Sequence, residues 1–485
     1  HEGPGKVSWS SPPARLTPCS VEPLPRPAGW WVSPGEGPHW SLPICGPRGR
    51  LGPSMEPGLP AVVSVLGPVA LDPGPHGVGP ATLLRDRLLG DGRMAWGVAA
   101  DEIEEEVTME RLWDLRLNPA AVPSNLLLSS VPDAVAETRR LVGTTGSAVV
   151  VDCTPHDEGR NPRGLVLVAR EVPGLTVVMG AQPPREAPTD AEAVAAALVR
   201  ELMVGVGLVP PVPVPGGALH CARAGVIGEI AVGKAGAASE TLLSEEVVVL
   251  RGAGMAQRQT GAPLILSVPR DASPLLVLDA ITTARNGGAA LNRTVLAGVD
   301  IQDLDAGLRA LLADGLRLCV GGFGESYVLH QSLGLGRLPL RDDELAREMA
   351  TLVAEGAAAP SQLIPSMHLR MKTQLVRYGG HGYGHVHGSL VCRTLKQQQL
   401  SDGQVSAMCH TGDELLRWWN PPPMPEPVAR KSVCSWCGKQ FVYDDNEHFS
   451  KFDFEYCKSS CLRKHRKANF EPRREQGGGG GGGGS

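Results

Sequence analysis

Short apolar runs alternate with amphipathic segments between residues 60 and 418, and this alternation constrains the fold more than any other feature of the chain. The apolar runs are VVSVLG (62–67), SAVVVDC (147–153), LTVVMGA (175–181), GVIGEIAV (225–232), PLILSV (263–268), TVLAGV (294–299), LRLCVGGF (316–323) and QLIPSM (362–367). Segments of helical period lie between them, for example at 190–206, 303–315 and 342–356. Continuous apolar strands separated by helices indicate parallel strands that are buried on both faces.

Eight such strand–helix units predict an α/β protein with a closed (β/α)8 TIM barrel over residues 60–418. An open, doubly wound sheet is the alternative. In a barrel of this kind, reactive and binding groups lie at the C-terminal ends of the strands. Glu229 interrupts the fourth apolar run near its end, so we expect its carboxylate at the barrel mouth. A buried carboxylate is costly unless it is paired, either with a bound group or with a neighbouring arginine.

The segments outside the barrel have compositions that do not support a packed core. Residues 1–59 are rich in proline and glycine without any period, and we expect a disordered leader there. Residues 419–430 form a proline-rich linker, and residues 471–485 end in a run of glycines that predicts a flexible tail.

Charge and hydropathy exclude some classes of partner. The net charge of -5 gives no global reason to expect nucleic acid or an anionic membrane as partner. No stretch reaches the roughly 18 apolar residues that a membrane span needs, and the N-terminus has no basic-then-apolar signal pattern. We therefore expect no membrane association and a reducing compartment, the cytoplasm or the nucleus.

Four of the 11 cysteines form two close pairs within residues 431–470. The pattern CSWC at 434–437 followed by CKSSC at 457–461 is a strong signal for one structural zinc ion held by Cys434, Cys437, Cys457 and Cys461. So small a unit needs the metal, because its core alone is too small for stability. The segment resembles treble-clef and FCS-like zinc fingers. His448 or His465 in place of one thiolate is the alternative.

A basic stretch follows the second cysteine pair. Its charged side chains are Arg463, Lys464, Arg466 and Lys467. We interpret them as a solvated face or a protein contact; contact with nucleic-acid phosphates and a nuclear localisation signal are the alternatives.

Seven segments of the barrel region share a further pattern. They are VLGPV (65–69), VDCTPHDEGRNP (151–162), VVMGA (177–181), RAGVIGEI (223–230), TGAPLI (260–265), DLD (303–305) and RYGGHGYGHV (377–386). In order and spacing they resemble the phosphotriesterase-related family of amidohydrolase-type, metal-dependent hydrolases. The resemblance covers residues 60–418, and the RYGGHGY block is its most specific part.

The resemblance implies a set of metal ligands for two divalent ions, usually zinc, at the barrel mouth. The set consists of His-x-His after the first strand, a bridging carboxylate on the fourth, one histidine each on the fifth and sixth, and an aspartate on the eighth. Two close cations hold a hydroxide that is nucleophilic at neutral pH and polarise the scissile bond. Histidines suit zinc, and a carboxylate bridges the two charges.

This chain departs from that ligand set at most positions. The bridging carboxylate is retained as Glu229. In the family a Leu-Leu-x-Asp follows the His-x-His; if Leu83, Leu84 and Asp86 are its counterpart, the His-x-His position falls on Pro80, Ala81 and Thr82. The other three positions carry Ser267, Gly298 and His368. Glu229 and His368 cannot form a site of three protein ligands plus water.

A rebuilt metal site would need histidines from the GGHGYGHVHG block, namely His381, His385 or His387. The alternatives are packing or solvated histidines, or remnants of a substrate pocket. Glu229, His368 and His381 are the catalytic remnants, and we expect no second zinc in the barrel. The sequence thus favours a non-catalytic scaffold or binding protein with a protein partner. The alternative is a zinc-dependent hydrolase of ester, phosphoester or amide bonds with a rebuilt site.

Overall fold

The computed structural model describes residues 61–71, 79–99, 105–186, 188, 190–214, 217–234, 239–325, 339–418, 431–442, 448–451, 454–468 and 470. The leader 1–59, the linker 419–430 and the tail 471–485 that the sequence predicts to be disordered lie outside these residues. None of the helices in the described ranges has the length and apolar character that crossing a bilayer requires.

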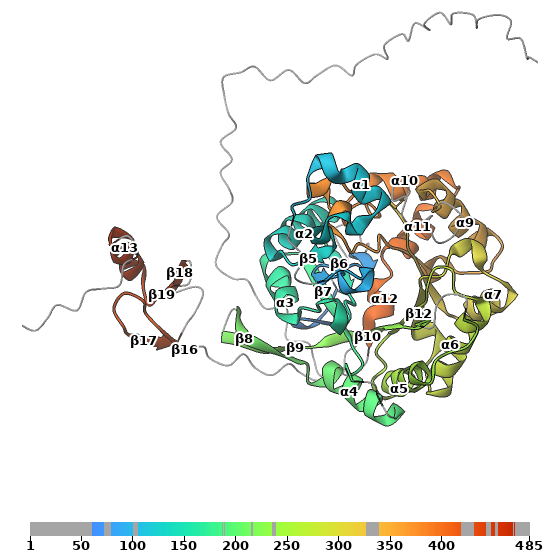
Figure 1. Ribbon diagram of the computed structural model, residues 1–485, viewed down its shortest axis with the longest axis horizontal. Coiled ribbons are helices and arrows are strands. Elements are labelled where there is room, and N and C mark those ends of the chain that lie inside the picture. The colour runs from blue at the N-terminus through green and yellow to red at the C-terminus, as the bar shows by residue number, and fades with distance from the viewer. Residues whose placement is uncertain are drawn as a thin grey trace, which may run out of the picture. The chain divides into compact units, whose positions relative to one another are not determined.

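Eight parallel strands form the centre of the barrel region (Figure 1). In sheet order they are β3 (Ala81–Leu84), β6 (Ala148–Asp152), β7 (Leu175–Ala181), β10 (Ala224–Ala231), β11 (Leu264–Ser267), β12 (Thr294–Ala297), β13 (Arg317–Val320) and β14 (Leu363–Pro365). Sheet order follows chain order, as in a (β/α)8 barrel. The predicted TIM-barrel class is confirmed.

The first and last strands approach each other through individual hydrogen bonds instead of a strand ladder. Ser366, just after β14, donates its hydroxyl to the carbonyl oxygen of Leu84 at 2.6 Å. Beyond the strands, the amide of Arg87 donates to the carbonyl of Leu369 at 2.8 Å. These contacts bring β3 and β14 together, so the sheet is a nearly closed barrel.

One of the eight predicted barrel strands is wrong. The apolar run 62–67 instead supplies β1 (Ala61–Ser64), which pairs antiparallel with β2 (Gly67–Val69) and β15 (Arg417–Trp418). Val62 packs in one buried cluster with Leu415 and Leu416, together with side chains of the barrel strands. The run is apolar because Val62 packs inside the barrel while Val63 and Val65 pack in the other, larger buried cluster, and β3 is the true first strand.

Strand residues alternate between two buried clusters, as the period of a β-strand requires. Val149 and Val151 of β6 face the cluster inside the barrel, whereas Val150 faces the larger cluster between strands and helices. The same alternation places Ile265 inside and Leu264 and Leu266 outside. Both faces of every strand are therefore buried, which explains the continuous apolar runs.

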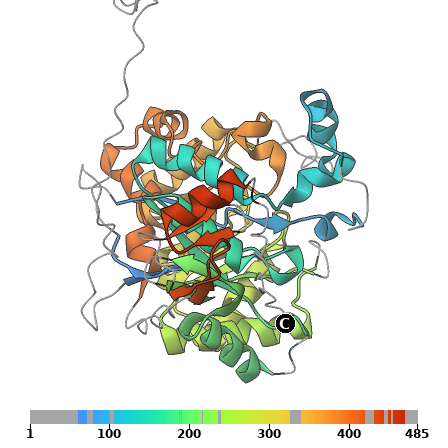
Figure 2. The same cartoon turned by 90° about the vertical axis from the view of Figure 1, so that its left-hand side faces the viewer.

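Helices surround the strands in the view of Figure 1, and Figure 2 shows the same elements turned by 90°. They are α1 (Leu112–Leu117), α2 (Val131–Thr145), α3 (Pro162–Glu171), α4 (Ala191–Met203), α5 (Ser244–Thr260), α6 (Pro274–Asn286), α7 (Ala306–Ala313), α9 (Asp342–Ala354), α10 (Ser389–Gln397), α11 (Asp402–Cys409) and α12 (Gly412–Leu416). The predicted segments 190–206, 303–315 and 342–356 correspond to α4, α7 and α9. Asp190 and Asp305 cap α4 and α7 by accepting from Ala193 and Leu308 amides.

An antiparallel hairpin of β8 (Val206–Val214) and β9 (Gly217–Ala222) precedes β10, and the short strands β4 (Gly90–Asp91) and β5 (Leu127–Leu128) form another pair.

The C-terminal unit is built from two short hairpins and one helix. Strands β16 (Lys431–Val433) and β17 (Gln440–Val442) pair antiparallel, as do β18 (Phe449–Lys451) and β19 (Phe454–Tyr456); helix α13 (Ser459–Lys467) follows. The turn between β16 and β17 contains Gly438 at φ 71°, in the left-handed region that glycine adopts without strain. The small core centres on Tyr456, Cys434 and Cys461.

Candidate functional site

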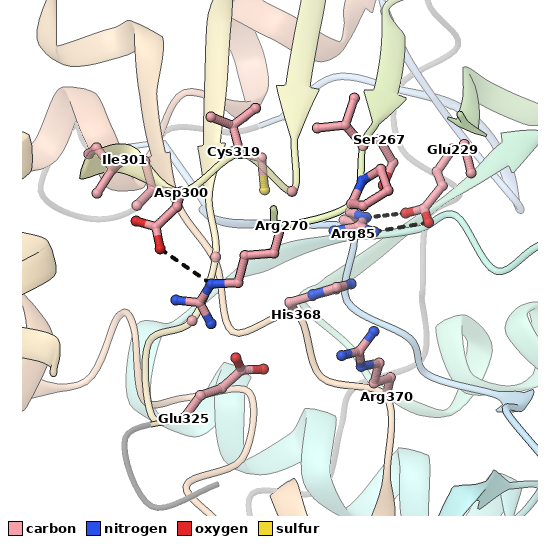
Figure 3. A pocket seen from close by; sticks show the side chains of 18 of the residues that line it. Arg85, Glu229, Ser267, Arg270, Asp300, Ile301, Cys319, Glu325, His368 and Arg370 are labelled. Carbon is pink, nitrogen blue, oxygen red and sulfur yellow. Dashed lines mark hydrogen bonds and ion pairs between the residues drawn. The ribbon is translucent and has the colours of Figure 1, made fainter. Parts of the chain in front are cut away.

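A cavity of about 340 Å³ opens at the C-terminal ends of the barrel strands (Figure 3). Its polar lining comes from six different strand ends or the loops after them. These residues are Arg85, Glu229, Ser267, Arg270, Asp300, Glu325, His368 and Arg370. The structure therefore brings together the predicted positions Glu229, Ser267, Gly298 and His368, which are distant in sequence.

An ion pair between Arg85 and Glu229 dominates this mouth. Arg85 follows β3, and its Nε and Nη2 atoms donate to Oε2 and Oε1 of Glu229 on β10, with 3.1 Å between Nη2 and Oε1 (Figure 3). A planar guanidinium matches a carboxylate in this two-point geometry. The carboxylate at the end of the fourth strand is thus paired with a neighbouring arginine.

Burial and charge act in opposite directions on this pair. Burial alone raises the pKa of Glu229, but the charge and hydrogen bonds of Arg85 hold that pKa below its usual value. Burial likewise works to lower the pKa of Arg85, and Glu229 raises it above its ordinary value. Both groups are therefore ionised at neutral pH, and each neutralises the other.

The position of Arg85 corrects the sequence assignment of the first-strand ligands. Pro80, Ala81 and Thr82 cannot follow the first strand, because Ala81 and Thr82 are residues of β3 and are fully buried. The sequence contains a second Leu-Leu-x-Asp, at residues 88–91, immediately after the strand end. With that motif as the anchor, the His-x-His position falls on Arg85, Asp86 and Arg87.

Arginine therefore stands at both histidine positions of this segment. Arg87 forms its own ion pair, with Glu158. A guanidinium carries a permanent positive charge and no lone pair for a metal, so neither residue can act as a ligand. The end of the first strand is the sequence signal that could have identified these two arginines. The chain has Leu-Leu both at 83–84 and at 88–89, which makes that strand end ambiguous.

The fifth- and sixth-strand positions also lack a metal-binding side chain. Ser267 is buried at the end of β11. Gly298 has a φ of 94°, and a Cβ at this position would lie 1.9 Å from the carbonyl oxygen of Val268. The backbone therefore has no room for a histidine at residue 298 without rearrangement.

His368 and Arg370 enter the cavity from the segment after β14. His368 has a φ of 51°, and Arg85 has a φ of 64°, so two of the left-handed non-glycine residues of the described chain lie at this mouth. Such backbone conformations are costly and persist where surrounding contacts impose them. Burial, and then the charges of Arg85 and Arg370, lower the pKa of His368 well below its usual value, so its imidazole is neutral.

Asp86 holds this backbone in place from inside the barrel. Its Oδ1 accepts from the Leu369 amide at 2.7 Å, and its Oδ2 lies 2.9 Å from the hydroxyl of Ser366. Ser366 carries one hydroxyl proton and already donates to the carbonyl of Leu84. A protonated Asp86 can donate to Ser366 and satisfy every group. Consistently, burial raises the pKa of Asp86 to about 7, against the opposing effect of its hydrogen bonds with Leu369 and Ser366.

We expect Asp86→Asn to flatten the pH dependence of stability between pH 5 and pH 8. A carboxyl whose pKa is raised in the folded state contributes stability that is present below its unfolded pKa and is lost as pH rises through its folded pKa. A rise from 3.8 to about 7 corresponds to up to about 4 kcal/mol. Asparagine mimics the protonated acid, so the variant should exceed the wild type in stability at pH 8.

Urea unfolding of both proteins at pH 5, 6, 7 and 8 measures this effect. The exposed Asp314→Asn substitution is the matched control, and its unfolding free energies should run parallel to those of the wild type. Parallel curves for Asp86→Asn as well would show that Asp86 does not titrate in this range.

The histidines proposed to rebuild a metal site are engaged elsewhere. His385 Nε2 lies 2.6 Å from Oδ2 of Asp342, and the exposed ring of His381 stacks on His385 with 4.3 Å between ring centres. His387 Nε2 lies 3.0 Å from the carbonyl oxygen of Thr82. Burial, followed by the neighbouring His410, lowers the pKa of His387 to about 3. Among the described residues, none of the three joins Glu229 or His368 in a group able to hold a metal.

The four predicted cysteine ligands form the one metal-capable group in the described ranges. Their sulfur atoms all lie within 4.8 Å of one another. The Cys437–Cys457 and Cys457–Cys461 sulfur distances are 3.6 Å and 3.9 Å. Tetrahedral zinc with Zn–S bonds of about 2.3 Å places its sulfurs about 3.8 Å apart, so the donors fit a zinc ion.

Local backbone geometry supports a thiolate at Cys434. Burial acts to raise the pKa of Cys434, but hydrogen bonds from backbone groups of Cys437, Cys457 and Trp436 lower it to about 6. The two alternative histidines lie outside this group of donor atoms. His465 is buried, and its Nδ1 lies 3.0 Å from the hydroxyl oxygen of Tyr456, whereas the ring of His448 packs on Phe441.

The basic residues of α13 all point to the surface. Arg463, Lys464, Arg466 and Lys467 are exposed, and the helix presents them around the buried His465. Three of them lie in its last turn, where positive charge complements the partial negative charge of a helix C-terminus. This electrostatic role needs no nucleic acid.

Two family models match the chain. The Phosphotriesterase family model matches residues 118–413, and the Vms1-associating treble clef domain model matches residues 429–473. The second match agrees with the predicted treble-clef likeness of the cysteine module.

Several known proteins are similar to the barrel region. A phosphotriesterase-related protein of Nematostella vectensis is 27% identical over 317 residues, which cover 62% of this chain and 84% of that protein. Human N-acetyltaurine hydrolase is 27% identical over 301 residues, covering 60% of this chain and 79% of the enzyme. Among solved structures, a resiniferatoxin-binding protein from Rhodobacter sphaeroides has 26% identity and a TM-score of 0.61, covering 73% and 94% of the two chains.

Proposed function

Because this chain belongs to the phosphotriesterase family and neutralises its remaining bridging carboxylate with an arginine, we propose that it is a non-catalytic member of that family. Its barrel would serve as a scaffold or binding unit, and its C-terminal treble clef domain would bind one structural zinc ion and a protein partner. The observation that carries this proposal is the two-point ion pair of Arg85 with Glu229 at the barrel mouth.

The residues of the mouth do not fit a pair of catalytic metal ions. Arginines occupy both positions of the first-strand histidine pair, and Ser267 and Gly298 occupy the positions on the fifth and sixth strands. Catalytic zinc requires three protein ligands and an open position for water. Two cations next to the guanidinium of Arg85 would also meet its repulsion in a buried site. The chemistry of a metal-bound hydroxide therefore has no support from this donor set.

The treble clef domain is the part of the chain to which we assign the protein partner. The matching domain model is named for association with Vms1. Val433 and Val442 are 54% and 53% exposed on the first hairpin of the domain, a large exposure for apolar side chains in so small a unit. Exposed apolar groups of this kind suit a protein contact better than a nucleic acid.

Binding to nucleic acid is the competing role for this domain, through Arg463, Lys464, Arg466 and Lys467. Neutralising phosphates releases counterions, so such binding would weaken steeply as salt concentration rises. The free thiols among the described cysteines suit a reducing compartment, which we propose to be the cytoplasm or the nucleus.

A metal-dependent hydrolase is the second candidate, favoured by the similarity to N-acetyltaurine hydrolases. It would act on an amide, ester or phosphoester bond. Glu229 and His368 would be its remaining metal ligands, although both carboxylate oxygens of Glu229 already accept hydrogen bonds from Arg85.

Turnover assays separate the two functions. The zinc-supplemented full-length protein should show no hydrolysis of aryl esters, lactones, phosphotriesters, N-acyl amino acids or N-acetyltaurine above the level of a Glu229→Gln variant. Turnover of any of these compounds that Glu229→Gln abolishes would establish the hydrolase instead.

A further inference from the structure

Besides the Arg85–Glu229 pair, the same cavity contains a second buried cation, Arg370. The Nε atom of Arg370 is buried and has no hydrogen-bond partner among the described residues. Figure 3 shows its guanidinium lying beside His368, and the charge of Glu325, which lines the same cavity, acts on it. Burial is the main cause that lowers the pKa of Arg370, yet a guanidinium remains charged at neutral pH. A buried guanidinium with an unsatisfied N–H is costly, so a bound anion that accepts from Nε would stabilise this group.

A neutral imidazole lies next to it with a free ring nitrogen. Nε2 of His368 is also buried without a hydrogen-bond partner in the described part of the chain. The left-handed backbone at His368 directs this ring, and the amides of His368 and Leu369 are fixed by Ser366 and Asp86. Two buried polar atoms without partners thus lie on one cavity wall, where a bound ligand could satisfy both.

The remaining wall defines the rest of the ligand. Val232, Val299, Val320 and Leu345 line the cavity with apolar surface. The acids Glu229 and Asp300 already hold Arg85 and Arg270, the second pair at 3.4 Å. The volume of about 340 Å³ lies at the small end of ligand pockets. Such a cavity suits a short apolar body with one anionic end.

We propose that the barrel mouth binds a small molecule with a terminal oxyanion, a carboxylate or a phosphate, held by the guanidinium of Arg370 and the imidazole of His368. A guanidinium binds such groups through two parallel hydrogen bonds. The inference rests on the proposed function, because it assigns the ligand to arginine and histidine side chains instead of to metal ions.

Calorimetric titration of the full-length, zinc-loaded protein tests the proposal. The probes are butyrate and butyl phosphate, with butyramide as the neutral analogue of butyrate. At least one anion should bind saturably and butyramide should not. Arg370→Met should weaken the binding by about tenfold or more, as expected for loss of a charge-assisted hydrogen bond.

Two controls keep the test independent of folding. Arg370→Met removes a buried charge whose largest electrostatic cost is burial, so the unliganded variant should melt no lower than the wild type. His368→Asn keeps a residue that tolerates the left-handed conformation and should also weaken binding. Equal binding of butyrate and butyramide, or unchanged anion binding by Arg370→Met, would overturn the proposal.

Zinc analysis of the same samples separates this inference from the proposed function. One zinc per chain with no anion binding would remove the anion site alone. More than one zinc, with binding still dependent on Arg370, would support the anion site and contradict the metal-free barrel.

Discussion

Replacing Arg85 with methionine is expected to destabilise the barrel by about 3–5 kcal/mol. The substitution leaves the Glu229 carboxylate buried without its two hydrogen bonds and without an opposing charge. Glu229 then has to be protonated, so the loss of stability should grow with pH. Urea denaturation of the barrel, followed by far-ultraviolet circular dichroism at pH 6 and pH 8, measures the effect.

A double-mutant cycle distinguishes this charge effect from lost packing. Glu229→Leu alone should also be destabilising, because it leaves the Arg85 guanidinium buried without its carboxylate partner. The double variant Arg85→Met/Glu229→Leu should regain much of the lost stability. Arg309→Met is the matched control, since Arg309 pairs with Glu355 at the surface and its loss should cost less than about 1 kcal/mol. An Arg85→Met protein as stable as the Arg309→Met protein would mean that something other than Arg85 balances Glu229.

Removing zinc is expected to unfold residues 431–470 completely while the barrel remains folded. Zinc binding to such small modules contributes about 10–16 kcal/mol, and this is also their folding free energy. The described core of the unit consists of a few side chains around Tyr456, Cys434 and Cys461, too few for stability without a metal. Hydrogen exchange read by mass spectrometry should show loss of protection in peptides from β16 to α13 after chelation, and unchanged protection in the barrel.

Cysteine substitutions refine this prediction. The Cys434→Ser/Cys437→Ser protein should behave like the chelated wild type. Cys221→Ser alters a half-buried free thiol outside the cluster and should leave the exchange pattern unchanged. Persistent protection of α13 in the double variant would mean that the module folds without its metal.

The fold was predictable because burial on both faces leaves a continuous apolar signal in each barrel strand. An apolar run indicates that a strand is buried but not which strands pair with it. For this reason the apolar pattern of 62–67 predicts a barrel strand that the structure does not contain. Val62 is as buried as a strand residue, but it packs with Leu415 and Leu416 in the barrel interior. The strand Ala81–Leu84 is fully buried, but it has only four residues and follows a proline, so its apolar pattern is too short to be recognised.

The candidate site was predictable in part. The end of the fourth strand indicated Glu229, the resemblance to the phosphotriesterase-related family indicated Ser267, Gly298 and His368, and the structure places all four at one cavity. The sequence did not predict the role of Arg85, because that role depends on where β3 ends. Two successive Leu-Leu motifs left this strand boundary ambiguous. The sequence did not predict Arg370 as a site residue, because no local sequence pattern distinguishes a buried arginine from an exposed one. Only the packed cavity shows that its Nε has no hydrogen-bond partner in the described chain. The cysteine spacing, in contrast, encodes its geometry locally and gave all four members of the cluster.

The number of zinc ions per chain tests the central claim most directly. Elemental analysis should be carried out on the full-length protein, purified with zinc present and then freed of loosely bound metal, beside the Cys434→Ser/Cys437→Ser variant. A barrel whose bridging carboxylate is held by Arg85 predicts one zinc per chain in the wild type and none in the variant. Two or three zinc ions in the wild type, with at least one retained by the variant, would contradict it.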